Sequence, residues 1–443
     1  MKLKLVFLSL LAFAFFTGTY AQVVVYGLRD CIGIGLEKNF SILIAKNNEA
    51  ISKNNVTPGN AGYLPSLSLS SRYGGTITTT TQDVDVTGNG NLIYKDAGAT
   101  SGSLGATLAL TIFNGFSVQT TYKKLGELSK LGELNTQITI ENYIANLLSV
   151  YYSYVQQVQL VSNQTYAVKL SKERLRIDEE RYLLGSNSKL QVLQSRVYFN
   201  ADSSSLSKQI ETLKATRIRL NELMAVDNMG MMFELKDTSI KVIPDLYYEK
   251  LYDETMKSNT SLLIAGKNKV ISGYDYKLIV ARSYPYLNFS GGYNYTLGTI
   301  TNSSLYKNQL LNGPNYGLTF GVNIFNGFNT RKDIRNSQIN VQSTELRYEE
   351  IVQGVKADLL TIYSAYSNNL RLITLQEQNY ETASENLNIA LEKYKLGNLS
   401  GLDLRDVQKS LLDARESLLS IQYQAKLAEI SLLQISGRIM EYY

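Results

Sequence analysis

The chain contains no histidine and no tryptophan, and Cys31 is its only cysteine. Without histidine, Ser-His and Cys-His catalytic pairs are excluded, and no His/Cys cluster is available to hold a metal ion. A single cysteine cannot form a disulfide within the chain. We therefore expect no cofactor and no metal site, and we predict that Cys31 is a small buried residue rather than a lipidated one.

Proline is also scarce. Only five prolines occur in 443 residues, and none lies between residues 66 and 243 or between residues 315 and 443. Because proline is the strongest helix breaker, these stretches can hold exceptionally long helices. The charge is nearly balanced, with 44 Lys and Arg against 39 Asp and Glu. Nothing in this balance indicates nucleic acid binding.

Long apolar runs are absent except at the start of the chain. Lys2 and Lys4 precede an apolar run at residues 5–16, and small residues follow up to Ala21. This order is typical of a secretory signal peptide, which we predict to be residues 1–21. No other run approaches the roughly 20 apolar residues of a membrane-spanning helix. If the exported chain enters a bilayer, we expect it to do so as a closed β-barrel.

Three blocks of sequence recur in the same order. TIFNGF at 111–116 returns as NIFNGF at 323–328, and RYLLGSNS at 181–188 returns as KYKLGNLS at 393–400, both 212 residues later. IAKNNEAIS at 44–52 returns as IAGKNKVIS at 264–272. We interpret this order as an internal duplication. The predicted parts are a first repeat at 22–225, a linker at 226–251 and a second repeat at 252–443.

Each repeat is expected to contain a long helical hairpin. Between residues 116 and 182 apolar residues recur three and four apart, as in coiled coils, and the second repeat has the same pattern. About 65 residues at 1.5 Å each predict a helix of roughly 100 Å. Gly185 and Gly397 follow these helices and predict turns into returning helices of about 40 residues.

Four segments alternate with period two, which predicts strands of about ten residues. Apolar side chains occupy one face and small or polar side chains the other. This pattern is typical of transmembrane β-barrels, although a soluble sheet with one packed face would alternate in the same way. The expected apolar positions are Leu67, Leu69, Tyr73, Leu104, Ala106, Leu108, Leu110, Ile112, Leu287, Phe289, Tyr293, Tyr295, Tyr316, Leu318, Phe320, Val322 and Ile324.

The two FNGF blocks are predicted to be the junctions where a strand becomes a helix. Phe113 and Phe325 should end the strand pairs at an aromatic girdle. Asn114-Gly115 and Asn326-Gly327 should adopt the unusual backbone dihedrals of the junction. Four strands per chain are too few to enclose a pore, so we expect three copies to supply twelve strands.

These features resemble the TolC-like outer membrane efflux protein family. The resemblance rests on the LP start of each first strand, the paired IFNGF junctions, the two Y-x-x-G turns and SGLDLRDVQKSLLDAR at 400–415. It implies an α+β membrane protein, with a trimeric twelve-stranded outer-membrane barrel continued by a periplasmic α-helical coiled-coil tunnel. It also implies a mixed α/β belt that includes 226–251 and the residues after Ile435. Pro58-Gly59 departs from the family pattern and predicts a break before the first strand.

The implied function is the exit channel of a tripartite efflux or type I secretion system in the outer membrane of a Gram-negative bacterium. The implied partners are two further copies of the chain, outer-membrane lipid, a periplasmic adaptor and an inner-membrane efflux or ABC transporter. The resemblance places adaptor contacts at the turns and a gate just beyond the second turn. The turn residues are Gly185, Ser186, Gly397 and Asn398, and the gate residues are Asp403, Asp406 and Tyr394.

The gate would come from the second hairpin alone. Gln191 and Gln194 hold the matching positions in the first repeat, and Leu399 stands where relatives have a closing arginine. Asp403 and Asp406 could instead be solvated acids that favour the start of a helix, and the glycines could serve the turns only.

Two other functional classes fit parts of the sequence. Paired carboxylates such as Asp403 and Asp406 occur in glycosidases, but we find no second catalytic set. A trimeric adhesin also combines a barrel with a coiled-coil stalk. Its strands would lie together at the C-terminus, whereas these lie in two internal pairs.

Overall fold

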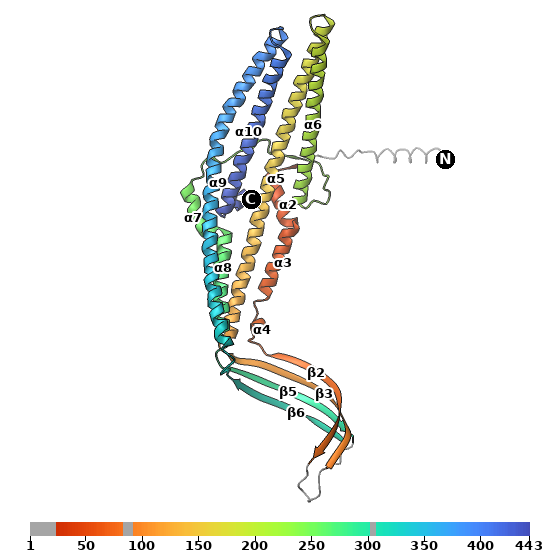
Figure 1. Ribbon diagram of the computed structural model, residues 1–443, viewed down its shortest axis with the longest axis vertical. Coiled ribbons are helices and arrows are strands. Elements are labelled where there is room, and N and C mark those ends of the chain that lie inside the picture. Colours follow the sequence, from red (N-terminus) through yellow and green to blue (C-terminus); the bar gives the residue numbers. More distant parts are fainter. Residues whose placement is uncertain (1–23, 83–91, 302–306) are drawn as a thin grey trace, which may run out of the picture. The chain divides into compact units, whose positions relative to one another are not determined.

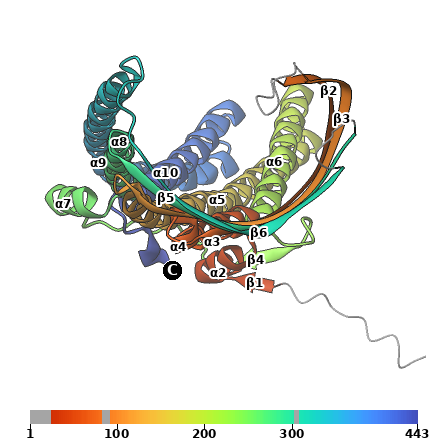
Figure 2. The same ribbon diagram turned by 90° about the horizontal axis from the view of Figure 1, so that it is seen from below.

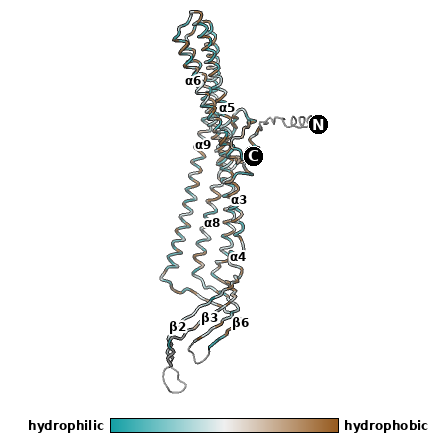
Figure 3. The backbone as a smooth tube through the Cα atoms, turned by 90° about the vertical axis from the view of Figure 1, so that its right-hand side faces the viewer, coloured by the Kyte–Doolittle hydropathy of each residue, from teal (hydrophilic) through white to brown (hydrophobic). Residues whose placement is uncertain are grey.

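The computed structural model describes residues 24–82, 92–301 and 307–443. The predicted signal peptide, 1–21, lies outside these residues. The chain divides into two units, which we call the helical unit and the sheet unit. The helical unit comprises Met1–Lys46, Thr136–Thr260 and Gln353–Tyr443, and the sheet unit comprises Asn47–Asn135 and Ser261–Val352. Among the described helices, none combines the length and apolarity needed to span a membrane, and hydrophilic and hydrophobic residues alternate along them (Figure 3).

Two helices of 67 residues, α5 (Ser117–Leu183) and α9 (Asn329–Lys395), confirm the predicted long helices. Each turns into a helix of 35 residues, α6 (Lys189–Leu223) or α10 (Gly401–Ile435), slightly shorter than expected. In the helical unit α6 lies beside α5 and α10 beside α9 (Figure 1). The heptad positions Ile144, Leu147 and Tyr151 are fully buried, as the period predicts, whereas Val158 is 44% exposed.

The largest core of the helical unit packs α2 (Leu28–Lys38) against α5 and α6. Cys31 lies in this core at 0% exposure, which confirms the predicted buried cysteine. A short parallel pair, β1 (Val24–Tyr26) with β4 (Phe233–Leu235), lies at its edge. β4 lies within 226–251, the predicted mixed α/β belt, but neither strand was predicted individually, because three-residue strands are too short to show a period in sequence.

The 226–251 segment also leads into α7 (Tyr248–Ser258), and the C-terminus forms a 3-10 helix, η1 (Ile439–Tyr442). The linker and the C-terminus both hydrogen-bond to one buried carboxylate of α10, that of Glu429. Glu429 Oε1 accepts hydrogen bonds from Lys426 Nζ at 2.6 Å and from the Tyr442 hydroxyl, and Oε2 accepts from Ile243 N at 2.7 Å. A buried charge needs such partners, so the linker and the C-terminus are held on the same helix turn.

The sheet unit contains four antiparallel strands in the order β2-β3-β5-β6, which form a curved sheet (Figure 2). They are longer than the predicted ten residues. The strands are β2 (Ser66–Gln82), β3 (Leu92–Asn114), β5 (Tyr286–Ile300) and β6 (Asn308–Gly321).

The strand register confirms the predicted apolar face. Leu67 lies opposite Leu108, Leu104 lies opposite Tyr295, and Phe289 lies opposite Leu318. Because residues two apart point to the same side of a strand, these pairs bring the apolar positions of all four strands onto one face. Within this single chain the face is bare, since Leu67 is 75% and Leu318 67% exposed.

Two details of the strand prediction are wrong. The alternation continued to Ile324, but β6 ends at Gly321, opposite Tyr286. Pro285 precedes Tyr286 and has no N–H to extend the ladder, so residues 322–325 have no strand to pair with. The alternation also predicted that Ile112 follows Leu110 on the apolar face. In β3, however, a bulge leaves Ile112 without a partner, and Phe113 lies opposite Leu287.

The helices before the first strand of each pair differ. α3 (Phe40–Asn54) ends before Pro58, and a short helix α4 (Pro58–Ala61) follows, which confirms the predicted break. Thr57 caps α4 by accepting from Asn60 N, and Gly62 ends it with a φ of +92°. The corresponding helix α8 (Thr260–Ala281) is continuous up to the residues before β5.

Candidate functional site at the hairpin tips

Both hairpin turns have the same backbone design. Gly185 and Gly397 have φ values of +76° and +81°, in the left-handed region that favours glycine. The amide of Ser186 donates to Arg181 O at 2.9 Å, and that of Asn398 donates to Lys393 O at 2.9 Å. A Cβ added to either glycine would meet no atom within 4 Å. The positive φ therefore requires glycine at both positions, whereas the space around each glycine would admit a side chain.

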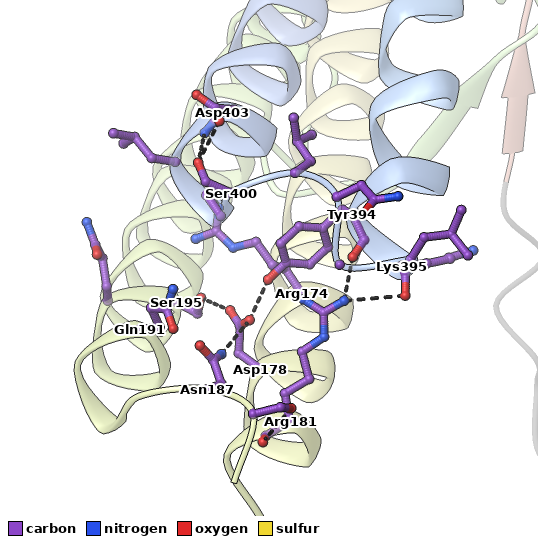
Figure 4. A pocket seen from close by; sticks show the side chains of 18 of the residues that line it. Arg174, Asp178, Arg181, Asn187, Gln191, Ser195, Tyr394, Lys395, Ser400 and Asp403 are labelled. Atoms are coloured by element: carbon purple, nitrogen blue, oxygen red, sulfur yellow. Dashed lines mark hydrogen bonds between the residues drawn. The ribbon is translucent and has the colours of Figure 1, made fainter. Parts of the chain in front are cut away.

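A buried carboxylate joins the two hairpins near these turns. Asp178 on α5 is 3% exposed and accepts from the Tyr394 hydroxyl of α9. It also accepts from Asn187 Nδ2 at 3.1 Å and from the Ser195 hydroxyl on α6 (Figure 4). Burial, and then the hydrogen bond to Asp178, raises the pKa of Tyr394, so this hydroxyl keeps its proton and remains a donor.

Three arginines link the helices near the hairpin tips. Arg181 lies over the Tyr394 ring, 4.9 Å from its centroid, and donates to the carbonyl oxygens of Tyr394 and Lys395. Arg174, 2% exposed, donates to Gly401 O at 3.3 Å. Desolvation lowers the pKa of Arg174. The third arginine, Arg405 on α10, forms two hydrogen bonds of 2.8 Å to Asp202 on α6.

Tyr198 on α6 lies between two of these cations. The Arg174 guanidinium is 4.7 Å and the Arg405 guanidinium 5.2 Å from its ring centroid. Aromatic faces attract guanidinium groups. Arg174 and Arg405 thus link α5, α6 and α10 through Tyr198. Arg174 and Arg181 also line a cavity of about 920 Å³ that both turns help to line.

A row of hydrogen bonds between α5 and α10 continues from the hairpin tips along both helices. Each contact is a side chain of α5 donating to a main-chain oxygen of α10 at 3.3 Å, and the partners step by seven and then eleven residues along both helices: Gln156 to Leu419, Asn163 to Leu412 and Arg174 to Gly401. At 3.3 Å these bonds are longer than the roughly 2.7–3.2 Å of ordinary N–H···O hydrogen bonds and are therefore weak. Contacts between α5 and α10 continue away from the tip, where the Tyr423 hydroxyl donates to Ser149 O at 3.2 Å and Gln434 Nε2 donates to Asn142 Oδ1 at 2.8 Å.

Two of the three predicted gate residues, Tyr394 and Asp403, line the cavity at the tips, whereas Asp406 does not. Asp403 accepts from the Ser400 hydroxyl at 2.7 Å at the start of α10, and Asp406 is exposed one turn further. Tyr394 instead contacts Asp178 and Arg181. No cluster of three potential metal-ligating side chains occurs among the described residues.

Sequence reasoning missed Asp178, Arg174, Arg181 and Arg405. Leu399 stands where an arginine was expected, but Arg181 reaches Tyr394 from the other hairpin. A signal was present, because Arg174, Asp178 and Arg181 recur at the four- and three-residue spacing of one helix face. Charges on such a face are usually solvated, so their burial could not be read from the spacing.

The strand-to-helix junctions are also built alike. Positive φ values at Gly115 and Gly327 confirm the glycine half of the predicted Asn-Gly dihedrals. The second positive φ of each junction falls on Phe116 or Phe328 and not on the asparagine. In each junction two phenylalanine rings three residues apart meet edge to face, with centroids 5.2 Å apart. Phe113 lies within β3, whereas Phe325 lies beyond the end of β6.

The surroundings of the two junction glycines differ. A Cβ on Gly115 would lie 2.4 Å from Ala281 O, whereas one on Gly327 would meet only the Asn329 side chain at 3.8 Å. Gly115 is thus required by space as well as by conformation. At the second junction Asn326 donates to the Thr330 hydroxyl at 2.6 Å, which links the turn to the first turn of α9.

Known proteins resemble the chain in sequence and in fold. TolC of Vibrio cholerae serotype O1 is 25% identical over 201 residues, and this match spans 44% of each protein's length. The outer-membrane channel OprN superposes with a TM-score of 0.74 at 16% identity over 93% of this chain and 89% of that one. The CmeC outer membrane channel of Campylobacter jejuni gives a TM-score of 0.76 at 14% identity, over 93% and 86%.

The family model of outer membrane efflux proteins matches residues 32–226 and 251–438. These two segments include both helical hairpins and all four long strands. The chain therefore belongs to the outer membrane efflux protein family, a family of outer-membrane exit channels rather than of enzymes.

Proposed function

We propose that three copies of this chain form the outer-membrane exit channel of a tripartite efflux or type I secretion system in a Gram-negative bacterium. The observation that carries this proposal is the four-stranded sheet with one bare apolar face and two open edges, β2 and β6. Four antiparallel strands leave edges that run in opposite directions. β6 of one copy can therefore pair antiparallel with β2 of the next, and three copies would close a twelve-stranded barrel.

The proposed architecture follows the internal duplication. Repeats at 22–225 and 252–443, joined by 226–251, would each supply two strands and one hairpin, after removal of the signal peptide at 1–21. The equal lengths of α5 and α9, and of α6 and α10, support this division. The hairpins of three copies would line a periplasmic tunnel.

The tips are proposed to serve two roles. Gly185, Ser186, Gly397 and Asn398 are exposed and would contact a periplasmic adaptor that leads to the inner-membrane efflux or ABC transporter. Asp403 and Asp406 are exposed and would face the tunnel axis, so that three copies present six carboxylates. Tyr394 would hold the closed state through Asp178, because this contact joins the second hairpin to the first.

Two measurements on detergent-extracted protein test the channel. The particle should have three times the chain mass, which is 49.6 kDa before signal-peptide removal. Inserted into a planar bilayer, it should conduct ions in discrete steps. A monomer that keeps its strand content, or a trimer that never conducts, would refute the proposal.

A further inference from the structure

Charge is segregated along the helices of the sheet unit. The three segments next to the strands, 117–126, 274–284 and 329–338, are helical except for 282–284, and they contain seven Lys or Arg and only two acids. The remaining helical segments of the unit, 47–54, 127–135, 261–273 and 339–352, contain five Lys or Arg and six acids. We call the first group the collar; its cations are Lys123, Lys124, Lys277, Arg282, Arg331, Lys332 and Arg335.

Ion pairs do not neutralise the collar. Its two acids are already shared, since Asp275 accepts from Lys124 and Asp333 lies 3.3 Å from Lys332 and 3.9 Å from Arg282. The other segments pair their charges, as in Lys267 with Glu127 at 2.6 Å and Lys269 with Glu345 at 2.6 Å.

Three collar cations remain available. Lys123, Arg331 and Arg335 are exposed and take part in none of the ion pairs found among the described residues. Lys277 is also exposed, with its ammonium 5.4 Å from the Tyr274 ring centroid.

The collar follows the apolar sheet face in a fixed order. β3 and β6 lead through the FNGF junctions into the collar segments of α5 and α9, and the collar end of α8 leads into β5. Phe116 and Phe328, 60% and 66% exposed, lie between the strands and the cations. Ten helical residues cover about 15 Å. An apolar face, an aromatic pair and then cations match the hydrocarbon, interface and phosphate levels of one leaflet.

We propose that the collar binds the phosphate groups of anionic phospholipids in the periplasm-facing leaflet of the outer membrane. This inference rests on the proposed function, which inserts the apolar sheet face into that membrane. Guanidinium and ammonium groups bind phosphate by charge-assisted hydrogen bonds, and the missing acidic partners leave those donors free for lipid. The collar then anchors the helices at the membrane surface.

The test is native mass spectrometry of the trimer with phosphatidylglycerol or phosphatidylcholine added to the detergent. The wild type should retain phosphatidylglycerol preferentially, less so at higher salt. The triple variant Lys123→Gln, Arg331→Gln, Arg335→Gln should lose about a hundredfold in phosphatidylglycerol affinity, since each surface cation contributes roughly fivefold. Inorganic phosphate should not displace the lipid, because it has no acyl chain to lie against the sheet.

A matched control removes the same charge from exposed lysines of the helical unit: Lys172→Gln, Lys208→Gln and Lys214→Gln. It should bind phosphatidylglycerol like the wild type. Three outcomes would overturn the inference. They are equal retention of both lipids, an equal loss of phosphatidylglycerol affinity in the control, and loss of the trimer in the triple variant, which would show that the collar cations bind neighbouring copies and not lipid. Trimer mass and conductance are measured on the same samples, so a failure of the channel proposal is seen separately.

Discussion

The Tyr394 hydroxyl of α9 donates a hydrogen bond to the Asp178 carboxylate of α5, across 216 residues of sequence. The acceptor carries a charge and is buried, and hydrogen bonds to charged groups contribute about 1.5–3 kcal/mol. Because Asp178 also accepts from Ser195 on α6 and from Asn187 in the first turn, this contact joins α9 to both helices of the first hairpin.

Removing that hydroxyl should favour the open channel. Tyr394→Phe deletes the inter-hairpin donor but leaves Asn187 and Ser195 to satisfy Asp178. A loss of about 1.5 kcal/mol corresponds to roughly a tenfold rise in the open-to-closed ratio, read as open probability in single-channel recordings. Tyr380→Phe is the control, since Tyr380 lies in the same apolar cluster. Equal open probabilities in all three proteins would contradict the gate.

The acids after the second turn should set ion selectivity. With Asp403→Asn and Asp406→Asn together, six carboxylates would leave the proposed entrance, and cation selectivity should fall. Asn can still accept from the Ser400 hydroxyl, so the start of α10 should fold normally. The reversal potential in a salt gradient measures the effect. Wild-type selectivity in the variant would show that these residues are solvated helix acids only.

Bulky residues at the turns should separate docking from folding. Ser186→Trp with Asn398→Trp adds volume at exposed positions beside Gly185 and Gly397 without changing either glycine. We expect efflux in cells to be lost while trimer level and single-channel conductance are kept. Efflux at the wild-type level would mean that the turns make no essential contact with an adaptor.

The two FNGF glycines offer a matched pair for measuring stability. Both have positive φ, so alanine should cost about 1–2 kcal/mol at either site through backbone strain. Only at Gly115 would the new Cβ also press on Ala281 O. Gly115→Ala should therefore lower the unfolding temperature of the trimer clearly more than Gly327→Ala. Equal shifts would show that the close approach at Gly115 relaxes freely.

Alkaline pH should destabilise the helical unit. Burial raises the pKa of the Cys31 thiol to about 12 and that of the Tyr366 hydroxyl to about 12. Both groups are neutral when protonated, and above their ordinary pKa values the unfolded chain releases protons that the folded chain keeps. The stabilisation is complete below pH about 9 and is lost as pH rises toward 12, by about 1.4 kcal/mol per pH unit for each group.

Urea unfolding at pH 8 and pH 11 measures this loss. Cys31→Ala should decline less steeply with pH than the wild type, although the cavity lowers its stability at both values. A wild type equally stable at both pH values would mean that these groups titrate normally when folded.

Much of the fold could be predicted because it depends on neighbours in sequence. The scarcity of proline and the three-and-four spacing of apolar residues predict α5 and α9, and Gly185 and Gly397 predict where they turn. Period-two alternation predicts which strand residues share a face. Each of these properties follows from backbone geometry over a few residues, so the sequence determines it without knowledge of the partners.

The tertiary structure decided the contacts between hairpins and the ends of strands. β6 ends at Gly321 because its partner β5 begins at Tyr286, and the alternation of β6 holds no trace of that limit. Likewise Asp178 is buried against Tyr394, and Asp202 against Arg405, only because the two hairpins lie together. A charged residue on a helix is solvated or buried according to what packs on that face, and that choice is made by segments more than 200 residues away.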